Sequence, residues 1–444
     1  MRSTSDDAEP TWSRRAVLAG LGGFSAGAVT GPVRAAGTGS TGHRRGAGTT
    51  VATWNCYLGV DLFRLFDADS LSEVRSLAGD LLADARGHPY AARADAIADQ
   101  LLSVGADVIA LQEAALVRAR PTFDEDAETE TVADLLALVT DALAARDASY
   151  EVVTTQVTTD VAVPAAVDGD WVTVRLTDRV ALLVREGVEV RETRSGRYDA
   201  RARFEVLGDD LVVTLRRGYC LADLAVAGEP LTVCSTHLES AKAAVRRKQA
   251  TELLDVLPDE GTVVVGADLN SGPSRNRRAY ETVTGSLSDA AATTGSPGDT
   301  CCQPADLRNE DSRLASRVDQ ILARGAPDPT AVQRLGEASE DRVQATVDGE
   351  SVTVWPSDHA GVAATYPIPD PTATPSPTPS PTASPTPSPT PSPTARPTPL
   401  TTESPPESPS DHSGTTDGTG AGVGVLGALA ALVGGALARR GGRD

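Results

Sequence analysis

Six short polar motifs supply the side chains in this 444-residue sequence that are best suited to chemistry. Most of them stand directly after an apolar run that predicts a strand. In chain order they are Asn55, Gln112-Glu113, Thr236-His237-Leu238-Glu239, Asp268-Leu269-Asn270, Arg317-Val318-Asp319 and Ser357-Asp358-His359. Open α/β folds place their sites where strands end, so these carboxylates, amides and histidines are candidates for one active site.

The motifs resemble those of the endonuclease/exonuclease/phosphatase superfamily, which includes DNase I-like nucleases, abasic-site endonucleases, neutral sphingomyelinases and inositol phosphatases. The resemblance covers roughly residues 50–366. It is carried by Thr53-Trp54-Asn55, Ile109-Ala110-Leu111-Gln112-Glu113, Ser235-Thr236-His237-Leu238, Gly266-Ala267-Asp268-Leu269-Asn270 and Trp355-Pro356-Ser357-Asp358-His359. Each stretch alone is a weak indication of the family, but the occurrence of all of them in the family order is a specific one. One departure is Ala267, which separates Gly266 from Asp268 where the family usually has Gly-Asp.

The resemblance implies a hydrolase of phosphoric ester bonds that depends on Mg²⁺ or Mn²⁺. The anionic oxygens of a phosphodiester repel an attacking water, and a hard divalent cation with oxygen ligands offsets that charge. By the resemblance, Glu113 is the principal metal ligand, with Asn55 and Asp358 beside it.

The attacking water must also lose a proton. The resemblance gives that role to His359, with Asp319 orienting the ring and stabilising the imidazolium. Asp268 and Asn270 lie two residues apart on a strand-like segment, which predicts that their side chains share one face. By the resemblance, they position the water and contact the phosphoryl oxygens. By the resemblance, His237 is expected to donate a hydrogen bond or a proton to the phosphate or the leaving group. Whether it acts as an acid or as a hydrogen-bond donor stays open, because no partner carboxylate is evident.

Three further polar residues are weaker candidates. Arg179, in Thr177-Asp178-Arg179, is a candidate contact for the substrate phosphate, with an ordinary surface ion pair as the alternative. Arg246 and Gln249 match an Arg-x-x-Gln pattern seen in relatives, for which a structural role is expected.

The segments beside these motifs predict alternating strands and helices. Helical spacing of apolar residues predicts helices over 91–104, 131–145 and 241–257. Short apolar runs predict strands over 50–54, 107–111, 172–174, 180–184, 211–215, 221–227, 231–235, 262–266, 318–323 and 361–365. Such a mixture indicates a layered α/β domain. The resemblance narrows it to a DNase I-like fold over residues 50–367, a four-layer α/β sandwich of two mixed β-sheets flanked by helices.

The N-terminus predicts export. Ser13-Arg14-Arg15-Ala16-Val17-Leu18 resembles a twin-arginine signal, and Val33-Arg34-Ala35 offers a cleavage site with small residues. We expect a signal peptide over 1–36 and a flexible linker over 37–49. A chance arginine pair in a flexible terminus is the alternative.

The C-terminal segments predict display at the cell surface. Residues 368–419 are rich in Pro, Thr and Ser, which predicts an extended stalk. An uncharged apolar run follows and ends at Arg439-Arg440, which predicts a membrane anchor over 420–440 at the lower limit of spanning length. Signal, body, stalk and anchor together resemble haloarchaeal surface proteins, so we expect a secreted, haloarchaeal-type member of the family.

The net charge of −21 bears on both habitat and substrate. Among 40 basic residues, only Lys242 and Lys248 are lysines, a composition typical of proteins adapted to high salt. An ordinary acidic secreted protein from a GC-rich genome is the alternative. The charge disfavours strong DNA binding by a broad basic face.

Three classes of phosphoester partner fit the motifs: nucleic acid, a lipid head group, or a small phosphorylated metabolite. A nuclease-like phosphodiesterase is favoured, since extracellular DNA would be a nutrient for a surface-held enzyme. The first alternative is another phosphoesterase, either a phospholipid or sphingomyelin-type phosphodiesterase or a small-molecule phosphatase. The second alternative is a catalytically inactive surface binding protein. Glu113, Asp319, Asp358 and His359 are all present, which favours an enzyme. We expect a monomer.

The five cysteines do not form an obvious disulfide framework, because their number is odd. Cys220 and Cys234 lie on predicted neighbouring strands, and both a bridge and two buried free thiols fit that pattern. Adjacent Cys301 and Cys302 lack the CxxC spacing or clustered histidines of a zinc site.

Overall fold

The computed structural model of the chain describes residues 48–123, 127–207, 212–295 and 298–367. The predicted signal peptide (1–36), nearly all of the linker (37–49), the stalk (368–419) and the anchor (420–440) lie outside these residues. Among the residues that are described, no helix is both long enough and apolar enough to cross a membrane.

The first large sheet has the strand order β15-β18-β1-β2-β6-β3-β4, and the long β5 also pairs with β6. Its strands are β1 (Thr49–Asn55), β2 (Val108–Gln112), β3 (Leu116–Pro121), β4 (Glu130–Asp134), β5 (Tyr150–Val167), β6 (Asp170–Arg185), β15 (Ala331–Leu335) and β18 (Gly361–Tyr366). β1 and β2 are parallel, whereas β18 and β6 pair with them antiparallel. The parallel register places Asn55 opposite Gln112, so the motifs that end β1 and β2 lie side by side.

The second large sheet has the order β13-β14-β12-β11-β10-β7. Its strands are β7 (Glu189–Arg197), β10 (Gly218–Val226), β11 (Glu229–His237), β12 (Val263–Asp268), β13 (Ser288–Asp289) and β14 (Asp319–Arg324). β11 and β12 are parallel with His237 opposite Asp268, and β14 is antiparallel with Asp319 opposite Asp268. The pairing alone therefore aligns three predicted site residues in a row across this sheet.

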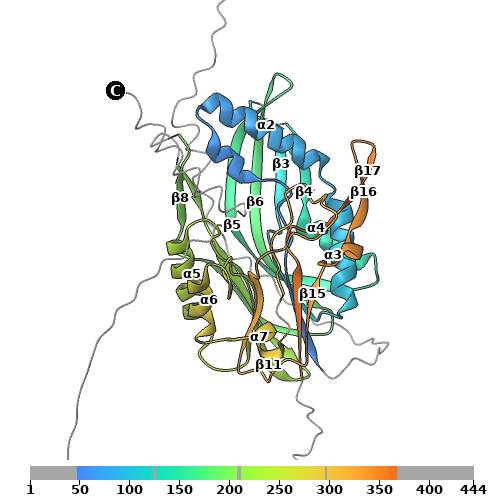
Figure 1. Cartoon of the computed structure of the whole chain (residues 1–444), viewed down its shortest axis with the longest axis vertical. Helices are drawn as coiled ribbons and strands as arrows, with labels where there is room; N and C mark the ends of the chain where they lie inside the picture. Colours follow the sequence, from blue (N-terminus) through green and yellow to red (C-terminus); the bar gives the residue numbers. More distant parts are fainter. Residues whose placement is uncertain (1–47, 124–126, 208–211, 296–297, 368–444) are drawn as a thin grey trace, which may run out of the picture. The chain divides into compact units, whose positions relative to one another are not determined.

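Helices cover the outer face of each sheet (Figure 1). η1 (Leu62–Asp67), α2 (Leu71–Gly87), α3 (Tyr90–Ser103) and α4 (Leu135–Ala144) belong with the first sheet. α5 (Ala243–Val256) and α6 (Arg277–Thr284) belong with the second, whereas the short α7 (Ala290–Thr294) contacts β13, β14 and β15 and packs Ala290 between the sheets. Two small hairpins, β8 (Ala202–Glu205) with β9 (Val212–Leu215) and β16 (Val343–Val347) with β17 (Glu350–Val354), and the short η2 (Ser339–Asp341) complete the described elements.

Alternating side chains along the strands build three apolar layers between the four layers of backbone. In β2, Val108 and Ala110 pack with Val264 of β12 in the core between the two sheets. Ile109, between them in sequence, packs with Ile97 of α3 on the other face. Successive strand residues point to opposite faces, so each central strand serves two cores at once. The predicted four-layer sandwich of two mixed sheets is confirmed.

The third apolar layer lies between the second sheet and its helices. Val263 and Val265 of β12 pack there with Leu253 of α5 and Val283 of α6. All four side chains are fully buried. Burying a valine or leucine of this kind contributes roughly 1.5–3 kcal/mol, so this layer anchors the strand that ends in Asp268.

Two predicted boundaries were wrong. The strands predicted at 172–174 and 180–184 are one continuous strand, β6, because its polar residues between them still pair with β3 and β5. The helix predicted at 131–145 begins only at Leu135, since 130–134 is β4. The Asp134 side chain accepts a hydrogen bond from Ala137 N–H and caps the helix there.

Strand register also settles the cysteine alternatives in the second sheet. Cys220 lies opposite Ser235, and Cys234 lies opposite Leu221. Cys220 faces the core between the sheets, whereas Cys234 faces the helical layer. The two side chains are on opposite faces, and both are buried free thiols rather than a bridge. Cys301 and Cys302 form a disulfide with each other.

Candidate active site

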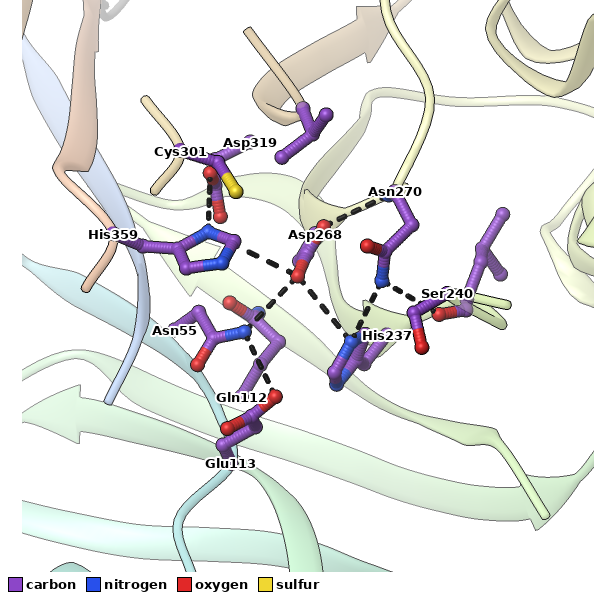
Figure 2. Close-up of polar contacts among 12 residues, drawn as sticks. Asn55, Gln112, Glu113, His237, Ser240, Asp268, Asn270, Cys301, Asp319 and His359 are labelled. Carbon is purple, nitrogen blue, oxygen red and sulfur yellow. Dashed lines mark hydrogen bonds and ion pairs between the residues drawn. The ribbon is translucent and has the colours of Figure 1, made fainter. Parts of the chain in front are cut away.

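The predicted catalytic residues meet where the two sheets end together, although they come from segments far apart in the chain (Figure 2). His359 lies just before β18, separated from it by Ala360, and Asp319 begins β14. His359 Nδ1 lies 2.8 Å from Asp319 Oδ2, and the two side chains are 6 % and 1 % exposed as residues. The Nδ1–H donates to the carboxylate, which leaves the ring's lone pair on Nε2.

Asp268 is the centre of the cluster. Its Oδ2 accepts a hydrogen bond from Asn55 Nδ2 at 3.0 Å and lies 3.3 Å from His237 Nε2. The same oxygen lies 4.0 Å from His359 Nδ1. Oδ1 accepts from the Asn270 N–H at 2.8 Å. Asp268 thereby joins the ends of β1, β11 and β12 and the segment before β18 (Figure 2).

Asn55 orients two carboxylates through one amide. Its Nδ2 donates to Glu113 Oε1 at 3.2 Å as well as to Asp268. Its Oδ1 accepts the N–H of Tyr57 at 3.0 Å, which leaves one lone pair of that oxygen for another partner. Ser357 Oγ in turn donates to the Asn55 carbonyl at 2.7 Å. The end of β1 is thus fastened to the segment that carries Asp358 and His359.

Glu113 follows β2 in a left-handed backbone conformation, with φ of +49°. This conformation turns its side chain towards Asn55, and Leu58 N–H donates to its Oε2 at 3.0 Å. Burial and the carboxylates of Asp358 and Asp178 raise the pKa of Glu113 to about 7. A non-glycine residue with such a φ is uncommon and is concentrated at functional sites.

The site contains more carboxylates than basic side chains. Burial raises the pKa of Asp358, against the opposing effects of His359 and Arg93. Burial and the Asp319 carboxylate raise the pKa of Asp268 to about 6. Glu113 itself has only an amide and a backbone N–H as hydrogen-bond partners among the described residues. Oxygen ligands and an excess of carboxylates are what a hard divalent cation requires, so Glu113 and Asp358 fit such an ion.

His359 carries the opposite perturbation. Burial lowers its pKa, but the carboxylates of Asp319 and Asp358 outweigh burial and hold the pKa well above its ordinary value. Oxygen and nitrogen atoms of Asp268, Asp319 and His359 all lie within 4.8 Å of one another. The arrangement therefore stabilises an imidazolium once one forms at this position.

One predicted reason for the placement of Asn270 was wrong. β12 ends at Asp268, and Asn270 lies beyond it with a left-handed φ of +48°. The two side chains therefore do not share a strand face. They meet because the chain turns back after Asp268, which brings Asn270 Nδ2 to 3.0 Å from both His237 Nε2 and the Leu238 carbonyl.

Arg179 makes contacts with the protein at the edge of the cluster. Its Nε donates to the Ala114 carbonyl at 2.7 Å, and its Nη2 pairs with Asp134. Arg246 donates to the carbonyls of Glu239 and Ser240, both at 2.7 Å, and Gln249 accepts the Glu239 N–H. These contacts of Arg246 and Gln249 hold the segment that follows His237, in line with the structural role expected for them.

Sequence patterns did not reveal three buried residues that support the site. Arg93 of α3 donates to the carbonyls of Cys56, Tyr57 and Pro356, and so ties the segment after Asn55 to the segment before Asp358. Arg217 and Asp178 lie behind His237. Arg93 and Arg217 belong to none of the motifs quoted above, and Asp178 stands in Thr177-Asp178-Arg179, where only Arg179 was a candidate.

The disulfide between Cys301 and Cys302 lies at the open side of His359. Cys302 Sγ is 3.6 Å from His359 Nε2, and Cys301 forms isolated backbone bridges with Ser316 and His359. The pair thus borders the nitrogen that faces the site.

The sequence of the chain matches a known protein family. A family model described as "Endonuclease/Exonuclease/phosphatase family" matches residues 52–359. No curated protein matches the chain. Among solved structures, truncated TDP2 from Caenorhabditis elegans is 18 % identical with a TM-score of 0.41, and the match covers 72 % of this chain and 98 % of that one. The mannosyl-6-phosphatase Bt3783 from Bacteroides thetaiotaomicron is 14 % identical with a TM-score of 0.43, covering 72 % and 100 %.

A family protein from Leptotrichia buccalis is 15 % identical with a TM-score of 0.44, covering 72 % of this chain and 100 % of that one. These similarities to solved structures are weak in themselves. The family model, in contrast, spans well over half of the sequence and begins and ends at the motifs described above. The chain therefore belongs to the Endonuclease/Exonuclease/phosphatase family of phosphoesterase-type hydrolases.

Proposed function

We propose that this protein is a divalent-metal-dependent phosphodiesterase that acts outside the cell. The observation that carries the proposal is the meeting of His359 and Asp319, 2.8 Å apart, with Asp268 and Asn55 beside an unneutralised Glu113. These residues come from both sheets and converge at one point. Burying so many polar groups together is unfavourable for stability, and such clusters are typical of functional sites.

Glu113 and Asp358 are the proposed ligands of Mg²⁺ or Mn²⁺, with Asn55 orienting Glu113. The cation, when bound, offsets the negative charge of the phosphoryl oxygens and relieves the repulsion among the carboxylates. In the protein alone, burial and that repulsion together raise the pKa of Glu113 to about 7.

His359 is the proposed general base. Its Nδ1–H is held by Asp319, which fixes the ring and leaves Nε2 to take the proton from water as the water attacks phosphorus. The imidazolium that forms is stabilised by the same carboxylate, as the raised pKa of His359 indicates. Asp268 lies between His359 and His237, and Asn270 contacts His237, so both are placed to orient the water and a phosphoryl oxygen.

The location of the enzyme is proposed from the sequence alone. The twin-arginine motif, the Pro/Thr/Ser-rich segment and the apolar C-terminal run support export and attachment to the membrane of a haloarchaeal-type cell. The acidic, lysine-poor composition supports a high-salt environment, and we propose a monomer. A nuclease-like activity is the first substrate class to test, followed by lipid head groups and small phosphorylated metabolites.

The test is hydrolysis by the purified full chain in molar KCl. Bis(p-nitrophenyl) phosphate, single-stranded and duplex DNA, RNA, sphingomyelin vesicles and sugar phosphates are each assayed with Mg²⁺, with Mn²⁺ and with EDTA. The proposal predicts turnover of at least one substrate that EDTA abolishes and added metal restores. Absence of metal-dependent turnover on the whole panel would contradict it, and the substrate that is cleaved fastest defines the class.

A further inference from the structure

Arg217 lies against the inner nitrogen of His237, although it belongs to none of the family motifs. Its Nη1 is 2.9 Å from His237 Nδ1. Arg217 is 8 % exposed and His237 is 1 % exposed, so water does not separate or screen the pair. The contact follows from strand register, because Gly218, the next residue, lies directly opposite His237 in the β10–β11 ladder.

The chemistry of the two groups fixes the state of the imidazole ring. A guanidinium has N–H donors and no acceptor, and it stays charged at every ordinary pH. His237 Nδ1 must therefore present its lone pair to Arg217. A neutral imidazole has one acceptor nitrogen only, so the single ring proton lies on Nε2.

The groups on the other side of the ring are compatible with this tautomer. Asp268 Oδ2, 3.3 Å from Nε2, is an acceptor for the ring proton. The Asn270 Nδ2 amide, 3.0 Å away, is a second donor near Nε2, but it has the Leu238 carbonyl as its own acceptor at 3.0 Å. An amide group can also turn to present its oxygen, whereas a guanidinium cannot. Arg217 therefore decides the tautomer, and Asn270 adapts to it.

Asp178 holds Arg217 in place. Its Oδ2 is 3.5 Å from Arg217 Nη1 and accepts a hydrogen bond from Thr158 Oγ1 at 2.7 Å. Asp178 is 4 % exposed, so this carboxylate is a buried counter-charge for the guanidinium. Burial and the positive charges of Arg217 and His359 keep the pKa of His237 well below its ordinary value. Asp268 is the one carboxylate among the groups described here that faces His237 directly.

We propose that Arg217, supported by Asp178, is a positioning residue that fixes His237 as the neutral Nε2–H tautomer. His237 then acts as a hydrogen-bond donor to a phosphoryl oxygen, and it is not the acid that protonates the leaving group. A general acid needs a proton that it can release near the working pH, and a doubly protonated ring is excluded beside a buried guanidinium. The catalytic part of this inference rests on the proposed phosphoesterase function, whereas the tautomer does not.

The tautomer is tested by nitrogen NMR of the full chain labelled with ¹⁵N-histidine. The chain has five histidines, and His237 is assigned by the signals that disappear in His237→Asn. The expected result is a neutral ring with its proton on Nε2, unchanged between about pH 5 and about pH 9. A proton on Nδ1, or uptake of a second proton by the wild-type ring in that range, would overturn the inference.

The role of Arg217 is tested with variants that change its charge and its donors. Arg217→Met with Asp178→Asn removes both buried charges together, so that neither is left unpaired. In this double variant His237 is expected to take up a second proton within the same pH range. Arg217→Lys, which keeps a cationic donor, is expected to restore the neutral ring. An unchanged His237 signal in the double variant would show that Arg217 does not fix the tautomer.

Kinetics on the substrate identified by the panel give the catalytic readout. The double variant is expected to lose on the order of tenfold to a hundredfold in kcat with little change in KM, and to gain a new ionisation in its pH–rate profile. Arg217→Lys should recover most of the loss, and Arg216→Met, at the neighbouring position, should match the wild type. A double variant with an unchanged pH–rate profile would overturn the catalytic role. If the wild type had no activity, the NMR result would still decide the tautomer.

Discussion

Glu113 shows how a single residue can be prepared for a cation. Its left-handed backbone turns the carboxylate towards Asn55, and burial together with the nearby carboxylates of Asp358 and Asp178 raises its pKa to about 7. The resulting repulsion destabilises the folded protein, because like charges are held together in a poorly solvated place. Residues arranged at such a cost are typical of sites that bind or react.

Glu113→Gln is therefore expected to weaken metal activation. The amide keeps the shape and the Asn55 contact but loses the charge, so the Mg²⁺ concentration for half-maximal activity should rise at least about tenfold. Glu192→Gln on the exposed face of β7 is the matched control and should titrate like the wild type. Identical metal titrations for Glu113→Gln and the wild type would remove Glu113 from the ligand set.

Asp319→Asn tests the partner of the base. The carboxamide cannot stabilise an imidazolium as the carboxylate does across the 2.8 Å contact with His359. We expect kcat to fall roughly 10²–10⁴-fold, with KM within a few-fold of the wild type. Steady-state kinetics give both values, and near-ultraviolet circular dichroism checks that the fold is kept. A kcat within threefold of the wild type would show that His359 does not need this carboxylate.

Among the elements, β1 and β18 pair with each other, and a buried arginine joins the segments that extend beyond this pairing. Arg93, fully buried in α3, donates to carbonyls on both sides of the site: Cys56 and Tyr57 after β1, and Pro356 before β18. Without it, these carbonyl oxygens would be buried without a partner, at a cost of about 1–3 kcal/mol for each group.

Arg93→Met is expected to lower the free energy of unfolding by roughly 2–5 kcal/mol, since several buried acceptors lose their donor. Arg86→Met is the matched control in α2, where the arginine pairs with Glu130 at an exposed surface. That change should cost no more than about 1 kcal/mol. Denaturant unfolding of both variants measures the difference, and equal losses would contradict this role of Arg93.

His88, at the junction between α2 and α3, makes the fold sensitive to acid. Burial and the neighbouring Arg93 lower its pKa to about 2, against an ordinary value of about 6.5. The unfolded chain therefore binds a proton below about pH 6.5 that the folded chain does not, and stability falls as the pH drops through that window.

At about pH 5 the loss due to His88 is expected to be roughly 1–2 kcal/mol relative to pH 8. Urea unfolding of the wild type and of His88→Asn at both pH values measures it. The variant lacks the titrating ring, so its stability should fall less between the two pH values. An equal fall in both proteins would show that His88 is not the cause.

The elements themselves explain how much could be predicted from the sequence. The strands that end in Asn55, Gln112 and Asp268 are fully buried and largely apolar runs that end in polar residues, and such runs were recognised directly. β5 and β7 were missed because their burial is irregular or slight, so no clear alternation marks them.

Site residues were predictable where a family motif contains them, and not elsewhere. His359 and Asp319 stand in motifs, and the structure brings them together. Arg217 gave no signal, because its contact with His237 arises from the pairing of β10 with β11. The sequence therefore could not decide whether His237 acts as an acid or as a hydrogen-bond donor, because it does not show which residue contacts the ring.

For the whole molecule, the net charge of −21 makes the stability of the fold depend on salt. Carboxylates on a surface repel one another, and salt shortens the range of that repulsion from about 10 Å at 0.1 M to about 3 Å at 1 M. We expect the melting temperature to rise as KCl is raised from about 0.1 M to molar concentration. Differential scanning calorimetry with sucrose as a neutral-solute control measures this, and a melting temperature that stays constant or falls would contradict adaptation to high salt.

The central claim is that the residues gathered around Asp268 form one metal-dependent hydrolytic site. The most direct measurement is the rate of bis(p-nitrophenyl) phosphate hydrolysis by the full chain, after EDTA and after Mg²⁺ or Mn²⁺ is restored, for the wild type, His359→Ala and Arg216→Met. We predict turnover that disappears with EDTA and returns with metal in the wild type and in Arg216→Met, and that falls at least about 10²-fold in His359→Ala. Turnover that is indifferent to EDTA, or equal in His359→Ala and the wild type, would contradict the claim.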